Sequence, residues 1–262
     1  MEARHVSSRD NPVFKRLVRL ASTSQARKRE GLSVIDGVHG VQTYLEKVGM
    51  PAILAVSESG QADPEIAALL RAHEAMPLVL ADALFKAVSH VGHGPGLLAA
   101  IATPRPELPA RIDTDCVLVE HLQDPGNLGS LLRSAAAAGV TQVFLSPSTV
   151  YAWSPKVLRA GQGAHFALVI HEGADLADIA ARLRVPLCAA SSHARRSLYE
   201  TPLAQPVAWL FGNEGAGVSA AMLARADHRL RIPLPGGAES LNVAAAAAIC
   251  LFEAVRQRTA GP

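Results

Sequence analysis

Residues 116–139 read CVLVEHLQDPGNLGSLLRSAAAAG, and this stretch decides the fold class. The apolar run CVLVE predicts a strand that is buried on both faces. The polar loop HLQDPGN then leads into a helix that ends at Gly139. Further strands are predicted downstream by QVFLS, LCAA, VAWLF and HRLRIP. Strands that alternate with helices indicate an α/β domain with a mainly parallel sheet, covered on both faces.

A second α/β pattern precedes this one. Strands are predicted by LSVID (32–36), AILAV (52–56), PLVLA (77–81) and LLAAIA (97–102). Helices are predicted after Asn11, through VQTYLEKV, and from Pro64 to His73. The segment TPRPELPARIDT (103–114) holds three prolines and indicates a linker. We therefore predict a smaller N-terminal domain over residues 1–106 and a larger domain over 107–262.

Composition excludes several classes of protein. Nearly half of the 262 residues are hydrophobic, which permits a sizeable core, and the net charge is only +2. The three cysteines form no CxxC pair, which argues against a disulfide framework or a zinc site, and no metal-ligand cluster stands out among the ten histidines. We expect buried free thiols and no metal. The N-terminus lacks an apolar signal core and no run is long enough to span a bilayer, so we expect a cytoplasmic protein without membrane contact.

Three polar loops follow predicted strands, where ligands of α/β sheets gather. In the first, Asn127 occupies a natural N-cap position and Arg133 lies six residues further along the helix. Taken alone, this loop is better explained as a capped amphipathic helix with a surface arginine. In the third, PLPGGAESLNV, Glu239, Ser240 and Asn242 open a helix predicted from about Glu239 to Arg258. These polar groups exceed what capping needs, which favours a binding loop.

The second loop, WLFGNEGAGVS (209–219), combines glycines with one carboxylate. Gly212, Gly215 and Gly217 permit close approach of the backbone to a ligand or a tight turn between strand and helix. Glu214 argues against a phosphate cradle because a carboxylate repels phosphate. The glycine order differs from G-x-G-x-x-G, which disfavours a nicotinamide-dependent oxidoreductase. The absence of a G-x-S-x-G elbow disfavours a Ser-His-Asp hydrolase.

Taken together, the three loops resemble the signature motifs of the SpoU-type (TrmH family) RNA ribose 2′-O-methyltransferases of the SPOUT class. The resemblance covers residues 114–262, where Ala244 replaces a serine found in many relatives. The upstream stretches 26–45 and 89–102 are similar, more loosely, to the RNA-binding module of that family. The residues that carry the main match are Asn127, Arg133, the run Phe211-Gly212-Asn213-Glu214-Gly215, Ile232-Pro233, and Ser240-Leu241-Asn242-Val243.

The resemblance implies a C-terminal catalytic domain with a deep trefoil knot, a homodimer, and S-adenosylmethionine as cofactor. It assigns cofactor contacts to Gly212, Ile232, Leu234 and Leu241. It assigns catalysis to Asn127, Arg133, Glu214, Ser240 and Asn242. Arg133 is sometimes cast as a base, but a guanidinium stays protonated, so we expect it to hold a phosphate and stabilise alkoxide charge.

RNA is the implied partner, and we expect ribosomal RNA in preference to transfer RNA. The first 31 residues hold eight basic and three acidic side chains, a pattern that also suits a solvated helix face. Beside a methyltransferase domain we expect this cluster to bind RNA, with binding that weakens with salt and with charge reversal. A non-catalytic RNA-binding protein of the same fold remains an alternative, although intact Arg133, Glu214 and Asn242 argue against it. The residues assigned to RNA are Arg16, Arg27, Lys28 and Arg29.

Overall fold

The computed structural model describes residues 5–89 and 96–259, and the chain divides into two compact units. One unit comprises Met1–Pro104 with Trp153–Phe166, and the other comprises Arg105–Ala152 with Ala167–Pro262. The proline-rich linker predicts a division close to the first of these boundaries. It gives no sign that residues 153–166 pack with the N-terminal unit. Residues 90–95, which belong to the stretch similar to an RNA-binding module, lie outside the described residues.

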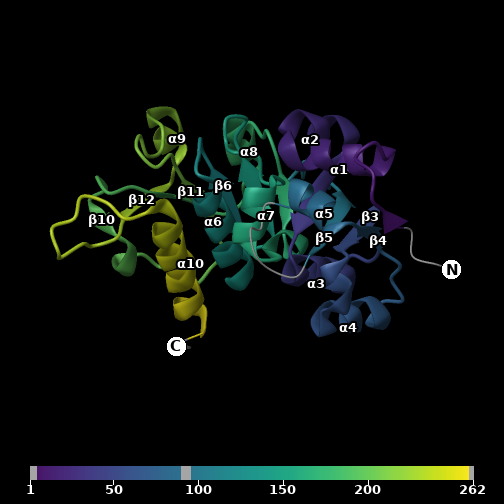
Figure 1. Ribbon diagram of the computed structural model, residues 1–262. Helices are drawn as coiled ribbons and strands as arrows, with labels where there is room; N and C mark the ends of the chain where they lie inside the picture. The colour runs from purple at the N-terminus through teal and green to yellow at the C-terminus, as the bar shows by residue number, and fades with distance from the viewer. Residues whose placement is uncertain (1–4, 90–95, 260–262) are drawn as a thin grey trace. The chain divides into compact units, whose positions relative to one another are not determined.

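The N-terminal unit contains a mixed sheet with α-helices around it (Figure 1). Its strands are β1 (His5–Val6), β2 (Leu32–Asp36), β3 (Ile53–Ser57), β4 (Leu78–Leu80) and β5 (Leu97–Ala102). Their order across the sheet is β1-β4-β3-β5-β2, and β5 runs antiparallel to both of its neighbours. The helices are α1 (Pro12–Ser22), α2 (Ser24–Glu30), α3 (Val38–Lys47), the 3₁₀ turn η1 (Ser59–Ala62), α4 (Pro64–Ala72) and α5 (Asp82–Val88).

Local sequence explains how the first helix begins and where it is buried. The Oδ1 atom of Asn11 accepts hydrogen bonds from the backbone N–H groups of Val13 and Phe14, at 2.9 and 3.3 Å. This confirms the helix start predicted after Asn11. Proline suits the first helical position because its missing N–H would have no partner within the helix. Leu17 and Leu20, three residues apart on one helix face, are fully buried in the core of this unit.

The C-terminal unit is built on a parallel sheet, as predicted. Its strands are β6 (Cys116–Val119), β7 (Gln142–Leu145), β8 (Val169–His171), β9 (Leu187–Ala190), β10 (Arg196–Ser197), β11 (Ala208–Phe211) and β12 (His228–Arg231). Their order is β10-β12-β9-β11-β6-β7-β8, and all neighbouring strands pair in parallel. The central strands β6 and β11 are fully paired and buried, which explains their continuous apolar runs.

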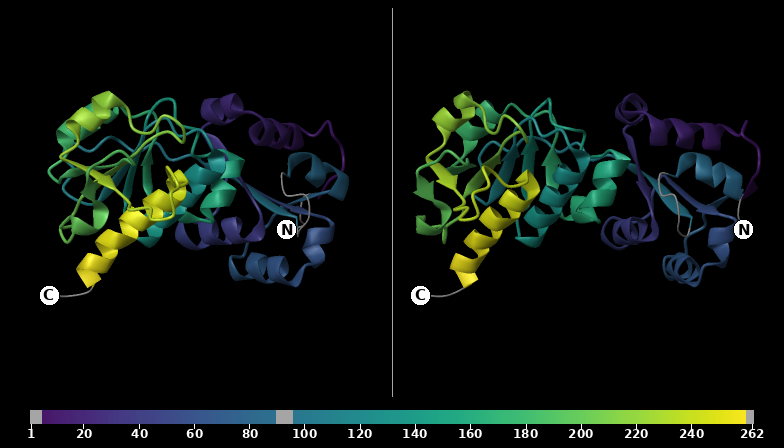
Figure 2. Two further views of the ribbon diagram at one scale, coloured as in Figure 1. Left: turned by 90° about the vertical axis from the view of Figure 1, so that its left-hand side faces the viewer. Right: turned by 60° about the vertical axis from the view of Figure 1, so that its left-hand side comes forward.

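Helices cover this sheet. They are α6 (Pro125–Ala137), α8 (Leu176–Arg182), α9 (Ala220–Arg225) and α10 (Val243–Thr259), with a 3₁₀ turn η3 (Leu198–Glu200). The remaining helix, α7 (Pro155–Gly161), belongs to the other unit, and the 3₁₀ turn η2 (Ala164–Ala167) spans the boundary between the units. Helices α6 and α10 pack side by side (Figures 1 and 2). Their N-termini therefore bring the first and third loops together.

The last helix starts later than the sequence predicts. It begins at Val243 instead of near Glu239, and residues 232–242 contain neither helix nor strand. The Oδ1 atom of Asn242 accepts hydrogen bonds from the backbone N–H groups of Ala244 and Ala245, at 2.9 and 3.3 Å. Asn242 is thus the cap, and the polar residues before it are released for other contacts. The trefoil knot implied for this region stays a prediction.

The three cysteines are buried and free, as expected. Burial raises the pKa of the thiols of Cys116, Cys188 and Cys250 to about 12, so they stay protonated near neutral pH. No helix among the described residues is long and apolar enough to cross a membrane. Within the same residues, no group of three or more His, Cys, Asp or Glu side chains is placed to hold a metal ion.

Candidate functional site

A cavity of about 330 Å³ opens at the carboxyl edge of the parallel sheet. The loops that follow β9, β11 and β12 form its walls, together with the start of α10. All four residues predicted to bind the cofactor lie in this lining: Gly212, Ile232, Leu234 and Leu241. Two predicted catalytic residues, Glu214 and Ser240, lie there as well. The sequence therefore selects residues that share one cavity, although two separate loops, after β11 and after β12, supply them.

Only glycine fits at position 212, because the surrounding backbone leaves no room for a side chain. A Cβ atom at this position would overlap the backbone of Gly217 and Val218. The overlap arises because the loop folds back on itself. The N–H of Asn213 donates to the carbonyl of Gly217 at 3.0 Å, and the N–H of Gly217 donates back at 2.9 Å. Gly217 has φ +69°, a conformation that favours glycine. The loop is therefore a closed structure beside the cavity.

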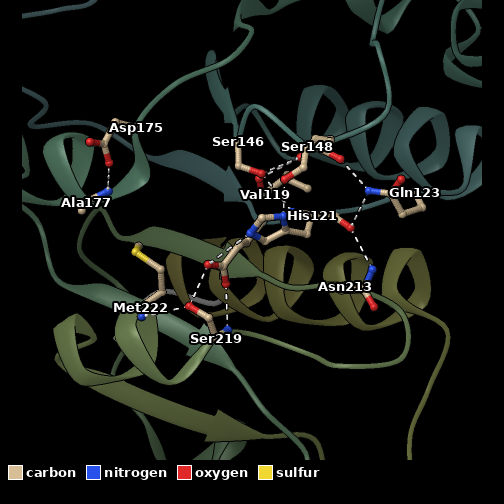
Figure 3. A network of polar contacts seen from close by, with 12 residues as sticks. Val119, His121, Gln123, Ser146, Ser148, Asp175, Ala177, Asn213, Ser219 and Met222 are labelled. Atoms are coloured by element: carbon tan, nitrogen blue, oxygen red, sulfur yellow. Dashed lines mark hydrogen bonds and ion pairs between the residues drawn. The ribbon is translucent and has the colours of Figure 1, made fainter.

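Asn213 organises this loop, a role that its motif position alone does not predict. Its Oδ1 atom accepts hydrogen bonds from the N–H groups of Gly215 and Ala216, at 2.9 and 3.0 Å. Its Nδ2 atom donates to the carbonyl of His121 at 2.8 Å, so that the loop is held to the end of β6 (Figure 3). Asparagine favours such turns because its side chain accepts hydrogen bonds from backbone N–H groups two or three residues on, and that residue type within a glycine-rich loop is the signal for Asn213.

Glu214 sits at the N-terminus of α6. Its carboxylate accepts hydrogen bonds from the backbone N–H groups of Asp124 and Gln123, at 2.9 and 3.3 Å. It also accepts one from Nδ2 of Asn127, at 3.3 Å. Burial would raise the pKa of this carboxyl, but these donors outweigh burial and hold the pKa below its usual value. A resident carboxylate thus occupies the helix end where a phosphate would otherwise bind, which explains a glutamate in a glycine-rich loop.

Asn127 links the first loop to the third. The sequence predicts it as the N-cap of α6, and this prediction is wrong. Asp124 is the cap, and its Oδ1 atom accepts a hydrogen bond from the N–H of Asn127 at 2.7 Å. The Asn127 side chain is therefore free to bridge Glu214 and Asn242, whose Nδ2 atom donates to Asn127 Oδ1 at 2.8 Å. Glu214, Asn127 and Asn242 form a chain that we call the amide relay.

The two other residues predicted to be catalytic stand outside the amide relay. Arg133 is exposed on α6, about a third of a turn around the helix axis from Asn127. It forms no hydrogen bond or ion pair with the residues that the structure describes, and it does not line the cavity. Ser240 lines the cavity but has no hydrogen bond to the relay. The structure thus joins three of the five residues and leaves the Arg133 guanidinium available.

Glu120 and His121, which directly follow β6, also support the site, although the sequence predicts no role for them. Glu120 is 6% exposed, and its carboxylate accepts hydrogen bonds from the N–H and hydroxyl of Ser219, at 2.8 and 2.7 Å. Ser219 in turn caps α9. His121 has φ +56°, and its N–H donates to Ser146 Oγ at 3.0 Å (Figure 3). A buried acid directly after an apolar strand is the sequence signal that marks this network.

The basic cluster at the N-terminus requires a correction. Arg27, predicted to contact RNA, is 5% exposed. Its Nη1 atom donates to the carbonyls of Leu20 and Ala21 at 2.6 and 3.1 Å, and it thereby satisfies the C-terminal end of α1. Arg27 is a structural residue because its guanidinium is turned inward.

The neighbours of Arg27 are exposed but partly neutralised. Glu30 accepts a hydrogen bond from Arg16 Nε at 2.6 Å. The Glu30 carboxylate also lies 3.9 Å from Arg19 and 3.8 Å from Arg29. Lys28 is exposed on the same helix as Arg29. Three arginines thus share one acid, and the RNA-binding assignment of Arg16, Lys28 and Arg29 stays a prediction.

We expect Glu214→Gln to destabilise the protein in a pH-dependent way. The folded-state pKa of Glu214 lies below its unfolded value, so the carboxylate contributes stability above an unfolded pKa of about 4.3 and loses that contribution as pH falls through the folded pKa. The difference in melting temperature from wild type should be largest near neutral pH and should shrink in acid. Thermal unfolding between about pH 7 and pH 3 measures it.

Glu239→Gln is the matched control, because Glu239 lines the same cavity without a hydrogen bond to the described residues. An equal loss of stability in both variants, or a loss that does not depend on pH, would contradict the stabilising role of the hydrogen bonds that the Glu214 carboxylate accepts before α6.

Comparisons with known proteins agree with this geometry. Residues 115–252 match the SpoU rRNA methylase family. The 23S rRNA (guanosine(2553)-2′-O)-methyltransferase of Bacillus subtilis is 32% identical and aligns with 88% of this chain and 91% of its own length. The 23S rRNA (uridine(2479)-2′-O)-methyltransferase of Streptomyces viridochromogenes is 28% identical, over 99% and 94% of the two chains.

Solved structures agree with the fold along nearly the whole chain. A crystal structure of an RNA 2′-O ribose methyltransferase superposes with a TM-score of 0.83 at 32% identity, and it covers 97% of this chain and 99% of its own. The SpoU methyltransferase of Streptomyces viridochromogenes, solved with the cofactor AdoMet, gives a TM-score of 0.86 at 28% identity. That match covers 96% of this chain and all of the other.

Proposed function

Because the chain belongs to the SpoU rRNA methylase family, we propose that it transfers a methyl group from S-adenosylmethionine to a ribose 2′-hydroxyl of RNA, with 23S rRNA as the favoured substrate. One observation carries this proposal: residues of the second and third motifs line a single cavity, and the amide relay joins Asn127 of the first motif to both of them. The full-length relatives cited above act on 23S rRNA by their names, which favours ribosomal over transfer RNA.

The cavity suits S-adenosylmethionine. Its volume of about 330 Å³ falls in the range of small-molecule sites. Gly212 leaves backbone groups accessible where any side chain would overlap the loop, and Ile232, Leu234 and Leu241 offer an apolar wall for an adenine ring. The carboxylates of Glu214 and Glu239 in the lining favour a cationic ligand. When bound, the cofactor supplies an activated methyl group on a sulfonium.

The residues of this chain must then position the ribose and stabilise charge as its hydroxyl loses a proton. The amide relay fixes Asn127 and Asn242 at the N-termini of two packed helices, where positive backbone dipoles favour a developing alkoxide. The Arg133 guanidinium has no partner among the described residues to displace, so it is available to hold a phosphate of the substrate. In this proposal Asn127, Asn242 and Glu214 orient the site, and Ser240 contacts substrate at the cavity wall.

The N-terminal unit is proposed to dock the RNA. Lys28 and Arg29 present exposed positive charge there and Arg16 is half-buried, whereas Arg27 serves the fold. We also propose that the enzyme works as a homodimer. The exposed Phe252 on α10, 46% accessible in the single chain, supports a partner on that helix.

Transfer of labelled methyl groups onto RNA pools tests the function. We expect purified protein with S-adenosylmethionine to label ribosomal RNA lacking the modification, and to label transfer RNA little. Mapping of the product should place the methyl group on a ribose 2′-oxygen. Label on a base, or labelling of transfer RNA alone, would contradict the proposed substrate and atom. Absence of cofactor uptake in calorimetry would remove the enzymatic function altogether.

A further inference from the structure

Arginines gather at one edge of the catalytic sheet. Arg195 and Arg196 lie at β10, Arg229 and Arg231 lie on β12, and all four side chains are exposed. The two strands pair in parallel, with Arg196 opposite Leu230. This pairing brings two arginine-bearing segments that are distant in sequence to one sheet edge, with Arg196 on the same face as Leu230. We call the four residues the arginine edge.

The arginine edge has no internal counter-charge among the residues that the structure describes. Its side-chain hydrogen bonds within these residues go to neutral carbonyls: Arg229 Nε donates to the carbonyl of Leu223 at 3.0 Å, and Arg231 Nε donates to the carbonyl of Arg195 at 3.3 Å. The acid at the start of the strand, Asp227, accepts the backbone N–H of Leu187 at 2.8 Å. The N-terminal cluster differs, because there Glu30 neutralises part of the charge.

The arginine edge adjoins the cavity. Leu230 and Ile232, which flank Arg231 in the chain, both line the cavity. Side chains alternate along a strand, so Arg231 and Arg229 point to the other side of the sheet from Leu230. The loop that leads to Arg195 contributes residues 191–193 to the same cavity wall. Arg229 and Arg231 therefore lie on the opposite face from the cavity-lining Leu230, whereas Arg196, paired with Leu230, and the loop residues 191–193 place the β10 end of the arginine edge beside the cavity.

Protection of the sheet edge against aggregation is the competing explanation. Edge strands often carry a charged residue for this purpose. Such protection works with charges of either sign, and it requires them only on the outermost strand. Here all four charges are positive, and two of them lie on β12, which is covered by β10 over part of its length. A surface whose charges are all positive, next to the cavity of an RNA-modifying enzyme, is better explained by binding of a polyanion than by protection of the edge.

We infer that the arginine edge binds the phosphate backbone of the RNA segment that flanks the target nucleotide. This inference rests on the proposed function and extends it, since it gives the catalytic unit an RNA contact of its own. Guanidinium groups suit this role because their fork of donors matches phosphate oxygens. The contact would be independent of sequence and would weaken with salt.

Paired charge reversals test the inference. We expect R195E/R196E to weaken binding of a 23S rRNA fragment by about tenfold or more near 0.1 M salt, and to lower the slope of log affinity against log salt by about 0.7–0.9 for each lost phosphate contact. Neither side chain forms a hydrogen bond within the described residues, so the fold should survive. Affinity for S-adenosylmethionine, measured by calorimetry, should stay at the wild-type value.

R111E/R184E is the matched control. It changes net charge equally, at the amino edge of the same sheet, where Arg184 N–H pairs with the carbonyl of Ile112. We expect it to leave the salt slope unchanged. An unchanged slope in R195E/R196E, or an equal change in both variants, would overturn the inference. R195Q/R196Q provides the same comparison with a smaller change in charge. Failure of wild-type protein to bind S-adenosylmethionine would instead overturn the proposed function.

Discussion

Arg133→Ala is expected to reduce methyl transfer by at least about 10²–10³-fold while affinity for S-adenosylmethionine and thermal stability stay near wild type. The size of the effect follows from the loss of a donor that acts on charge developing in the transition state. Its selectivity follows from the structure: Arg133 is exposed, lines no part of the cavity, and forms no hydrogen bond or ion pair with the described residues. Nothing in the described part of the fold depends on its side chain.

Single-turnover methylation of RNA and calorimetry with the cofactor separate these effects. Arg133→Lys keeps the charge but loses the planar fork, so we expect it to recover part of the lost rate. A second control, Arg184→Ala, removes an exposed arginine at the other edge of the sheet and should leave turnover unchanged. Near-normal turnover in Arg133→Ala would take Arg133 out of the mechanism. A large loss of cofactor affinity would make it a binding residue.

Most longer strands of the two units are predictable, because a buried strand requires a run of apolar residues that is visible in the local sequence. LSVID and LLAAIA correspond residue for residue to β2 and β5, and the continuous apolar run at 116–120 marks the centre of the parallel sheet. Short elements escape prediction for the opposite reason. Strand β10 has only two residues, Arg196 and Ser197, and neither an apolar run nor an alternation signals it. Its existence depends on pairing with β12.

The contents of the site are predictable, whereas its connections are not. Motif positions suffice to select Gly212, Ile232 and Leu241 for the cavity. The hydrogen bond between Asn127 and Asn242 joins residues 115 positions apart, and no local pattern encodes it. The prediction that Arg27 contacts RNA fails for a related reason, because local sequence does not show which way its side chain points. In sequence it is equivalent to Lys28 and Arg29, and only the packing of α2 against α1 turns its guanidinium toward backbone carbonyls.

The remaining errors of prediction concern which residue caps α6 and which caps α10. Polar residues before a helix are ambiguous, because each of several can accept the first free N–H groups. In α6 the cap is Asp124, so Asn127 is released into the relay, and in α10 the cap is Asn242, so Glu239 and Ser240 are released into the cavity wall. The extra polar residues make the helix starts hard to predict. The same residues supply the side chains of the site.

Gly212→Ala is expected to abolish cofactor binding, with at least a hundredfold loss of affinity. The added Cβ would overlap the backbone of Gly217 and Val218, and backbone has no rotamer with which to withdraw. The paired loop must then open, and it carries Glu214 away from the N-terminus of α6. Forced overpacking of this kind costs about 1–3 kcal/mol or more, so the melting temperature should fall as well.

Gly215→Ala is the matched control within the same loop. A Cβ there would meet only Oδ1 of Asn213, at 3.6 Å, which is an ordinary contact. Calorimetry with S-adenosylmethionine, together with circular dichroism to select conditions in which each variant is folded, compares the two. Wild-type affinity in folded Gly212→Ala would show that the loop does not form the cofactor wall. Equal losses in both variants would show that the cavity tolerates no added methyl group, whatever its backbone neighbours, and the steric argument for Gly212 would fail.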